Sequence, residues 1–256
     1  MNLVLEKLQP KRWIMRVANS VYVLSIPRSP QEADSYLNLT LIADEENGNT
    51  LVDAGLPDQT EEISVALVEA GIGVRDLRRI IFTHQDLDHM GSGSALVRRS
   101  GAKVLAHSAD APYIEGRLRP LKPTPEMLEQ RPHMRKVLER LEPVGVDEQV
   151  ENGTRLDLAG GTQVIFTPGH TPGHISLYLE RSKILIAGDA LTADTGYLNS
   201  PNPMATLDMR TAIQSIQRLA DLDISTIICY HGGVVSEDAN GQLRRVIQEA
   251  FRNRNE

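Results

Sequence analysis

The chain has 256 residues and a formal net charge of −7, with 27 Lys and Arg residues against 34 Asp and Glu residues. This mildly acidic balance gives no electrostatic footprint for nucleic acid or for an anionic membrane surface, so neither is expected as a partner. One cysteine, no evident secretory leader and no apolar run of about 18 residues together predict a cytoplasmic protein without a membrane span.

The first part of the chain predicts a β meander followed by a helix. Strands rich in β-branched and apolar residues are expected at 21–24, 37–42 and 50–53. The pair Asn47-Gly48 between the last two strands is a strong hairpin signal. A helix is expected from about 59 to 70, capped by Asp58 and ended by Gly71.

The middle of the chain alternates strand and helix and then changes in character. A strand is expected at 79–83, a helix near 92–100 and a strand at 103–106. From 111 to 145 prolines interrupt the pattern, and we call this segment the helical excursion. Its apolar stripe at 127–141 predicts either a lid or wall over a substrate pocket, or a contact between two copies of the chain in a homodimer. Both interpretations stay open.

Strands resume in the last part of the chain and helices cover them. Strands are expected at 163–166, 175–179, 183–186 and 226–229, and helices at about 208–221 and 237–253. Strands early and late, with helices between them, predict an α/β fold in a single domain over residues 1–256, with two sheets and helices on their outer faces.

The most informative segment runs from Thr83 to His89. It contains four potential metal ligands directly after an apolar run, namely His84, Asp86, Asp88 and His89. Alternate residues of an extended segment share a face, so His84, Asp86 and Asp88 are expected to converge while His89 turns to a neighbouring point. Interleaved ligands of this kind suit a pair of metal ions a few ångströms apart.

Three further candidate ligands each follow a strand-like run, namely His170, Asp189 and His231. The two histidines add one imidazole each, and the carboxylate of Asp189 has two oxygens with which it can bridge two ions. The pattern therefore predicts one assembled site for two divalent metal ions.

Competing motifs fit poorly. Asp86-x-Asp88 begins like a calcium-binding loop, but Met90 and Val97 stand where that loop needs oxygen ligands. The sequence contains no phosphate-binding glycine loop and no Gly-x-Ser-x-Gly nucleophile elbow.

These residues resemble the metallo-β-lactamase superfamily, the glyoxalase II-like metallohydrolases. That family carries His-x-His-x-Asp-His, then a histidine in a Pro-Gly-His-Thr-x-Gly-His segment, a bridging Asp after Gly, and a final His. The matching positions here are His84, Asp88, His89, His170, Asp189 and His231. The resemblance extends from Val52-Asp53-Ala54-Gly55 to His231, and it implies an αββα sandwich with two mixed sheets and a dimetal site at the sheet edges.

Asp86 stands where the family has its second histidine. We expect it to be a metal ligand, the alternative being a supporting group that leaves one metal position weak. The carboxylates of Asp86, Asp88 and Asp189 and a bridging hydroxide together carry four negative charges, which balance two divalent ions. The usual family site carries one negative charge fewer, so the metal-bound water is expected to be less acidic here. Zinc is the first expectation for the metal, and the harder oxygen donor also favours Mn²⁺ or Fe²⁺.

Other residues near the motifs are expected to support the ligands. The resemblance implies that Asp53 orients a ligand, that Thr83 does the same, and that His174 hydrogen-bonds in support. His107 is expected to be structural or supporting.

The resemblance implies a hydrolase in which a hydroxide between the two metal ions attacks a carbonyl carbon, with Asp88 or Asp86 carrying the proton to the leaving group. A lactone or carboxylic ester is the first expectation for this small-molecule substrate, a thioester the second and a β-lactam the last. Lactonases of the family carry a Tyr three residues after the bridging Asp, where this chain has Thr192, so Tyr197 or Tyr230 is considered as a substitute. Two other classes stay open: an iron-dependent oxidoreductase of the same fold, and a catalytically weak metal-binding sensor or scaffold.

Overall fold

The computed structural model describes residues 14–28 and 35–252. Its first sheet has seven strands in chain order: β1 (Ile14–Ala18), β2 (Val21–Pro27), β3 (Tyr36–Ile42), β4 (Asn49–Val52), β5 (Leu77–Ile81), β6 (Lys103–His107) and β7 (Glu148–Val150). The first four strands are antiparallel neighbours, and the turn at Asn47-Gly48 joins β3 to β4 as predicted. From β4 onward the neighbours are parallel because a helix returns the chain between them.

The second sheet has six strands in the order β15-β14-β11-β10-β9-β8. Its members are β8 (Arg155–Leu156), β9 (Thr162–Phe166), β10 (Ile175–Leu179), β11 (Ile184–Gly188), β14 (Thr226–Cys229) and β15 (Gly233–Val235). The pair β11–β14 is parallel and the other neighbouring pairs are antiparallel. A separate hairpin is formed by β12 (Thr192–Asp194) and β13 (Tyr197–Asn199).

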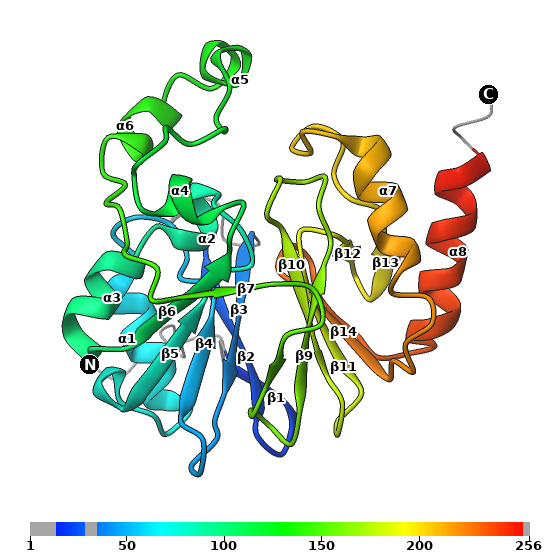
Figure 1. Cartoon of the computed structure of the whole chain (residues 1–256), viewed down its shortest axis with the longest axis horizontal. Coiled ribbons are helices and arrows are strands. Elements are labelled where there is room, and N and C mark those ends of the chain that lie inside the picture. The colour runs from blue at the N-terminus through cyan, green and yellow to red at the C-terminus, as the bar shows by residue number, and fades with distance from the viewer. Residues whose placement is uncertain (1–13, 29–34, 253–256) are drawn as a thin grey trace, which may run out of the picture.

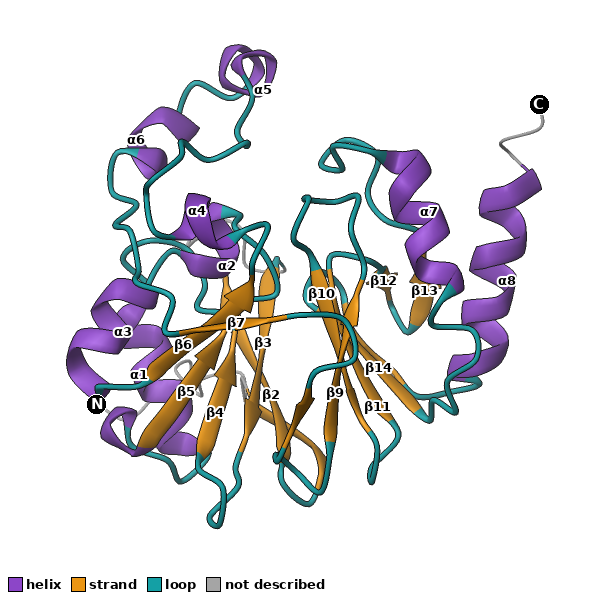
Figure 2. Ribbon diagram, viewed as in Figure 1, coloured by secondary structure: helices purple, strands orange, loops and turns teal. Residues whose placement is uncertain are grey.

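Three apolar clusters hold four layers together. One cluster joins the inner faces of the two sheets, including Val52 and Ile81 from the first and Leu177 and Ile186 from the second. A second packs α1 (Thr60–Glu69) and α3 (Gly93–Ser100) on the outer face of the first sheet. The third packs α7 (Met209–Gln217) and α8 (Ala239–Arg252) on the outer face of the second sheet. Figure 2 shows the resulting αββα order, which confirms the predicted α/β sandwich of two mixed sheets.

The helical excursion contains α4 (Ala111–Ile114), α5 (Pro125–Gln130) and α6 (Met134–Leu138). In Figure 1, α5 and α6 stand out from the body of the molecule at the same end as α4 and as α2 (Leu87–Met90). Within the described ranges, no helix is long and apolar enough to cross a membrane.

The longer predicted elements are confirmed to within a few residues, and two local predictions are wrong. Asp58 does not cap α1, because its carboxylate is paired with Arg140 at 2.9 Å and the cap position belongs to Gln59. The segment after His84 does not stay extended, because Leu87–Met90 forms the short helix α2 with Asp86 at its start. The strand β1 is not among the predicted elements. Nor are the short strands β7, β8, β12, β13 and β15, since two or three residues give too little pattern.

Candidate metal centre

The seven predicted ligands meet where strands of both sheets end. His84 follows β5, Asp189 follows β11 directly, and His231 follows β14. His170 lies in the loop between β9 and β10. The chain therefore brings segments more than 100 residues apart to one edge of the sandwich, as expected from the sequence.

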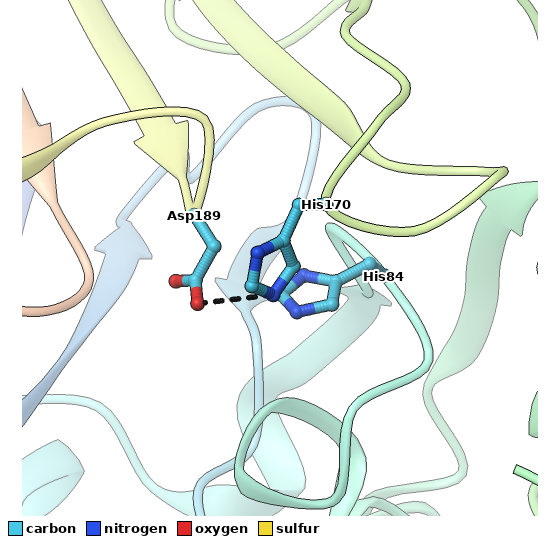
Figure 3. A group of neighbouring side chains, drawn as sticks. All are labelled: His84, His170 and Asp189. Carbon is cyan, nitrogen blue, oxygen red and sulfur yellow. Dashed lines mark ion pairs between the residues drawn. The ribbon is translucent and has the colours of Figure 1, made fainter. Parts of the chain in front are cut away.

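The ligand atoms fall into two groups. Those of His84, His170 and Asp189 all lie within 4.8 Å of one another, and those of Asp88, His89 and His231 do likewise. In Figure 3, His170 and Asp189, both from loops of the second sheet, lie beside His84, which follows β5 of the first sheet. Each group offers the three-donor arrangement typical of a protein metal site.

The two groups are not divided as the sequence predicted. Because the chain turns into α2 at Leu87, Asp88 is carried away from His84 and joins His89 and His231. Asp86 stays with the first group, since its Oδ2 lies 3.2 Å from His84 Nε2 and 3.0 Å from His170 Nε2.

Asp189 lies between the two groups. Its Oδ2 is 3.3 Å from His170 Nε2 in the first group and 3.5 Å from His231 Nε2 in the second. Its Oδ1 is 3.3 Å from His89 Nε2. This position is the one required of a carboxylate that bridges two ions.

Unsatisfied polar atoms show that the residues fit metal ions. In the part of the chain that the structure describes, four buried atoms of these side chains have no hydrogen-bond partner, namely His84 Nε2, Asp86 Oδ1, His89 Nε2 and Asp189 Oδ1. A buried polar atom without a partner is costly, and a cluster of such atoms that are all potential ligands suits a cation. Each atom is also a donor type that divalent zinc, manganese or iron accepts.

Asp53 and Thr83 fix the orientation of two histidines. Asp53 Oδ2 lies 2.9 Å from His89 Nδ1, and its Oδ1 accepts the Thr83 N–H at 2.8 Å. The Thr83 hydroxyl lies 3.0 Å from His84 Nδ1. With Nδ1 engaged behind, each ring turns Nε2 toward the site, in agreement with the role the resemblance implied for Asp53 and Thr83.

His174 supports the bridging aspartate. Its Nε2 accepts the backbone N–H of Asp189 at 2.9 Å, and its Nδ1 lies 2.8 Å from the Thr167 hydroxyl. Both ring nitrogens are therefore occupied by hydrogen bonds, as predicted. His107 lies apart, with its ring stacked on Phe166 at 4.2 Å.

Asp110 joins the two ligand-bearing loops, and sequence reasoning missed it. Its fully buried carboxylate accepts hydrogen bonds from Gln85 N–H at 3.0 Å, the Thr171 hydroxyl at 2.7 Å and Gly173 N–H at 2.7 Å. Gly173 is needed there because a Cβ would lie 2.5 Å from Asp110 N. Asp110 lies outside the motifs, and an Asp before Ala-Pro carries no local signal for this role.

Lys122 is the second residue that sequence reasoning missed. It comes from the helical excursion, is 6% exposed, and places Nζ 2.5 Å from Asp86 Oδ2 and 2.8 Å from His170 Nε2. It also donates to the Ala205 carbonyl at 2.7 Å. The balance of three carboxylates and a hydroxide against two divalent ions is therefore incomplete, because the buried ammonium of Lys122 adds a positive charge at the centre.

The carboxylates of the centre are held in their charged form. Burial raises the pKa of Asp86, but Lys122 and His84 outweigh it, and the pKa lies well below its usual range. Burial likewise raises the pKa of Asp189, and His231 and His89 reverse the shift and bring it well below its usual range. Charged carboxylates are the form that binds cations.

Neighbouring carboxylates favour the protonated forms of His89 and His231. Burial lowers the pKa of His231, but Asp189 and Asp88 outweigh it and raise the pKa to about 9. Burial lowers the pKa of His89 too, and Asp53 and Asp189 raise it well above its usual range. A metal ion must displace these protons, since an imidazole ligates in its neutral form.

A cavity of about 580 Å³ opens onto the centre and exposes Asp86, Asp88, Asp189 and His231 at its floor. The helical excursion supplies one wall, including Met127, Arg131 and Met134. Arg28 and Tyr36 from the first sheet and Met204 from the second half of the chain complete the lining. A cavity of this size is suited to a small molecule.

Neither tyrosine considered from the sequence faces this cavity. The ring of Tyr230 is buried, lies 3.8 Å from the His89 ring, and its hydroxyl donates to the Asp88 carbonyl. Tyr197 is 63% exposed and lines a separate hollow. Thr192 and Tyr36 line the cavity instead, and Tyr36 had no motif to mark it.

Known proteins are similar to this chain along most of its length. The family model described as "Metallo-beta-lactamase superfamily" matches residues 35–231. The Bacillus subtilis (strain 168) protein named "Probable metallo-hydrolase YflN" is 30% identical over 240 residues, covering 85% of this chain and 81% of the relative. An "N-acyl homoserine lactonase" from Bacillus sp is 27% identical over 208 residues, covering 78% and 74%.

Solved structures share the fold. A metallo-beta-lactamase family protein from Thermus thermophilus superposes with a TM-score of 0.74 at 24% identity, covering 94% of this chain and 81% of that one. At this identity the likeness concerns the arrangement of sheets and helices.

Proposed function

The chain belongs to the metallo-β-lactamase superfamily, and we propose that it is a dimetal hydrolase that cleaves a lactone or carboxylic ester. The observation that carries the proposal is the Asp189 carboxylate, which belongs to one three-donor group, lies within 3.5 Å of two histidines of the other, and lines the cavity. Two divalent ions held there would supply Lewis acidity and an activated water.

The donor set distributes over two metal positions. His84, His170 and Asp86 would hold one ion, and Asp88, His89 and His231 the other, with Asp189 shared. Orphaned nitrogen and oxygen atoms in both groups support this assignment. Zinc is our first proposal for the metal, followed by manganese or iron.

Asp88 is proposed to carry the proton to the leaving group. It borders the cavity and is 15% exposed, and Arg28 is 3.9 Å from its Oδ2. Asp86 is less suited to this role because its Oδ2 is already engaged by Lys122. A proton carrier must reach the cavity in which the leaving group departs, and the position of Asp88 in the cavity lining supports this role.

The cavity supports a small carbonyl substrate. Met127, Met134 and Met204 offer adaptable apolar contact, while Tyr36 and Thr192 add hydroxyl-bearing side chains to the lining. The likeness to an N-acyl homoserine lactonase supports a lactone or ester before a thioester.

The test is hydrolysis of a carbonyl panel by the purified protein: acyl-homoserine lactones, aryl esters, an acyl-glutathione thioester and a penicillin. Each assay is repeated after chelation and after adding back Zn²⁺, Mn²⁺ or Fe²⁺. We expect lactone or ester turnover that chelation removes and one metal restores. Oxygen uptake with iron in the absence of hydrolysis would contradict the proposal and favour the oxidoreductase.

A further inference from the structure

We propose that Lys122 is a positioning residue of the metal centre that pairs with Asp86, so that the two side chains together replace one neutral ligand. Lys122 holds Oδ2 of Asp86 and offsets the charge of this carboxylate, while Oδ1 is buried without a hydrogen-bond partner. The inference rests on the proposed metal centre but not on the identity of the substrate.

The contacts of Lys122 are those of a fixed internal group. Its ammonium has three partners, Asp86 Oδ2 at 2.5 Å, His170 Nε2 at 2.8 Å and the Ala205 carbonyl at 2.7 Å. An ammonium has three hydrogens, so this environment satisfies it fully. A lysine that is 6% exposed and held at three points is part of the centre and not a mobile cation of the cavity wall.

The two oxygens of Asp86 are in different situations. Oδ2 receives the ammonium and approaches His84 and His170, while Oδ1 is buried without a hydrogen-bond partner. If His170 Nε2 binds a metal ion, the Lys122 ammonium would still have Asp86 Oδ2 and the Ala205 carbonyl as partners. Lys122 therefore fixes the orientation of the Asp86 carboxylate beside the two histidines.

The charges point to the same pairing. The resemblance leads one to expect a neutral histidine at position 86, and the aspartate brings one additional negative charge into a buried site. In the described part of the chain, Lys122 is the one Lys or Arg within 4.0 Å of an Asp86 oxygen. Its single positive charge offsets that of Asp86, so the centre keeps the charge of a site with two carboxylates.

The pairing also ties the cavity wall to the metal centre. Lys122 lies between α4 and α5 of the helical excursion, and Ala205 lies in the loop before α7. The same ammonium thus joins the excursion, the α2 loop and a loop of the second half of the chain.

The experiment is a double-substitution cycle on the full-length protein with four members: unchanged, K122M, D86H and D86H/K122M. Methionine matches the length of the lysine stem and removes the charge. Zn²⁺ affinity and stoichiometry are measured by competition with a chromophoric chelator, and Co²⁺ absorption reports the coordination. Hydrolysis is not used as a readout. Inactivity toward the carbonyl panel would therefore refute the proposed substrate but would leave the measured effect of Lys122 and Asp86 on metal binding unchanged.

We expect the effect of K122M to depend on what stands at position 86. In the D86H protein, no carboxylate offsets the Lys122 ammonium, which then repels a bound Zn²⁺ ion. Adding K122M removes this repulsion and should raise Zn²⁺ affinity by about tenfold or more, which is the size of effect seen when residues next to metal ligands are replaced. In the protein with Asp86, K122M has two opposite effects on Zn²⁺ affinity. Loss of the ammonium removes a repulsion and raises the affinity, while loss of the contact that orients Asp86 lowers it, so the net change should be much smaller. Lys103→Met serves as the control, because Lys103 is an exposed residue paired with Glu148.

Two outcomes would overturn the proposal. Equal effects of K122M in both backgrounds, within about twofold, would show that Lys122 and Asp86 act independently. Uptake of one more metal ion by K122M than by the unchanged protein would show that Lys122 fills a metal position and does not balance Asp86. If D86H fails to fold, K122M and Lys122→Arg are compared alone: Lys122→Arg should keep the Co²⁺ spectrum that K122M alters, and identical spectra would contradict the pairing.

Discussion

Asp53 lies behind His89 with its Oδ2 2.9 Å from His89 Nδ1, on the side of the ring away from the metal centre. The backbone of Asp53 has a positive φ of 64°, so the carboxylate is aimed by a conformation that most residues avoid. The same carboxylate receives both the N–H and the hydroxyl of Thr83. One residue directly after β4 thus holds the segment from Thr83 to His89 at both of its ends.

This relationship predicts different effects for two substitutions of Asp53. Asp53→Asn keeps a residue that tolerates positive φ but loses the negative charge, so metal affinity should fall by about tenfold with little loss of stability. Asp53→Ala should lower both metal affinity and the free energy of unfolding. The measurements are chelator competition and urea unfolding, and equal stability of the two variants would contradict the backbone argument.

Loss of Asp189 should affect both metal positions, whereas loss of His170 should affect one. Asp189→Ala is expected to reduce bound metal below that of His170→Ala, since Asp189 approaches histidines of both groups. Either change should lower turnover by more than about 100-fold, because even partners outside the coordination shell are worth 10–100-fold. Metal content and circular dichroism are measured together, and full activity in either folded variant would refute the site.

Asp110 should matter for stability more than any exposed carboxylate. Asp110→Ala leaves Gln85 N–H, the Thr171 hydroxyl and Gly173 N–H without their acceptor, which should lower the unfolding free energy by about 3 kcal/mol or more. The control is Glu61→Ala, which removes an exposed partner of Arg99 and should change little. Urea unfolding of chelated protein is the measurement, and similar losses in both variants would count against the role given to Asp110.

Metal uptake should release protons. Because the pKa of His231 is raised to about 9 in the metal-free protein, the ring is charged at pH 7 and must lose its proton to bind metal. Metal affinity should therefore rise with pH up to about 9. The raised pKa also stabilises the metal-free fold below the ordinary value of about 6.5, and this contribution is lost as pH rises through about 9.

Calorimetry in two buffers of different ionisation enthalpy counts the released protons. The unchanged protein should release at least one proton per metal centre at pH 7.5, and His231→Asn should release fewer. A proton count that His231→Asn leaves unchanged would show that this ring does not titrate on binding.

The wall formed by the helical excursion should act on substrate binding and not on metal. Met127→Ala and Met134→Ala enlarge the cavity without touching a ligand, so KM for an acyl substrate should rise several-fold while metal affinity stays unchanged. Met15→Ala on β1 is the matched control, since that methionine is exposed and does not line the cavity. A kcat loss with unchanged KM would contradict a role in substrate contact.

The layers of the fold and the convergence of the candidate ligands follow from local sequence pattern. Period-two strands such as Tyr36–Ile42 and the Asn47-Gly48 turn encode their structure locally, and His84, His170, Asp189 and His231 each follow a strand whose end lies at one sheet edge. Local pattern suffices here because side-chain direction and turn geometry depend on near neighbours.

The arrangement of charges at the site depends on contacts that form when the chain folds. The division of Asp86 and Asp88 between two groups follows from the turn into α2, and the roles of Asp110 and Lys122 follow from contacts across 25 and 36 residues of chain. No periodicity or motif marks such residues. Their function comes from burial beside a partner of opposite charge or beside several donors, and that proximity exists only after the chain has folded.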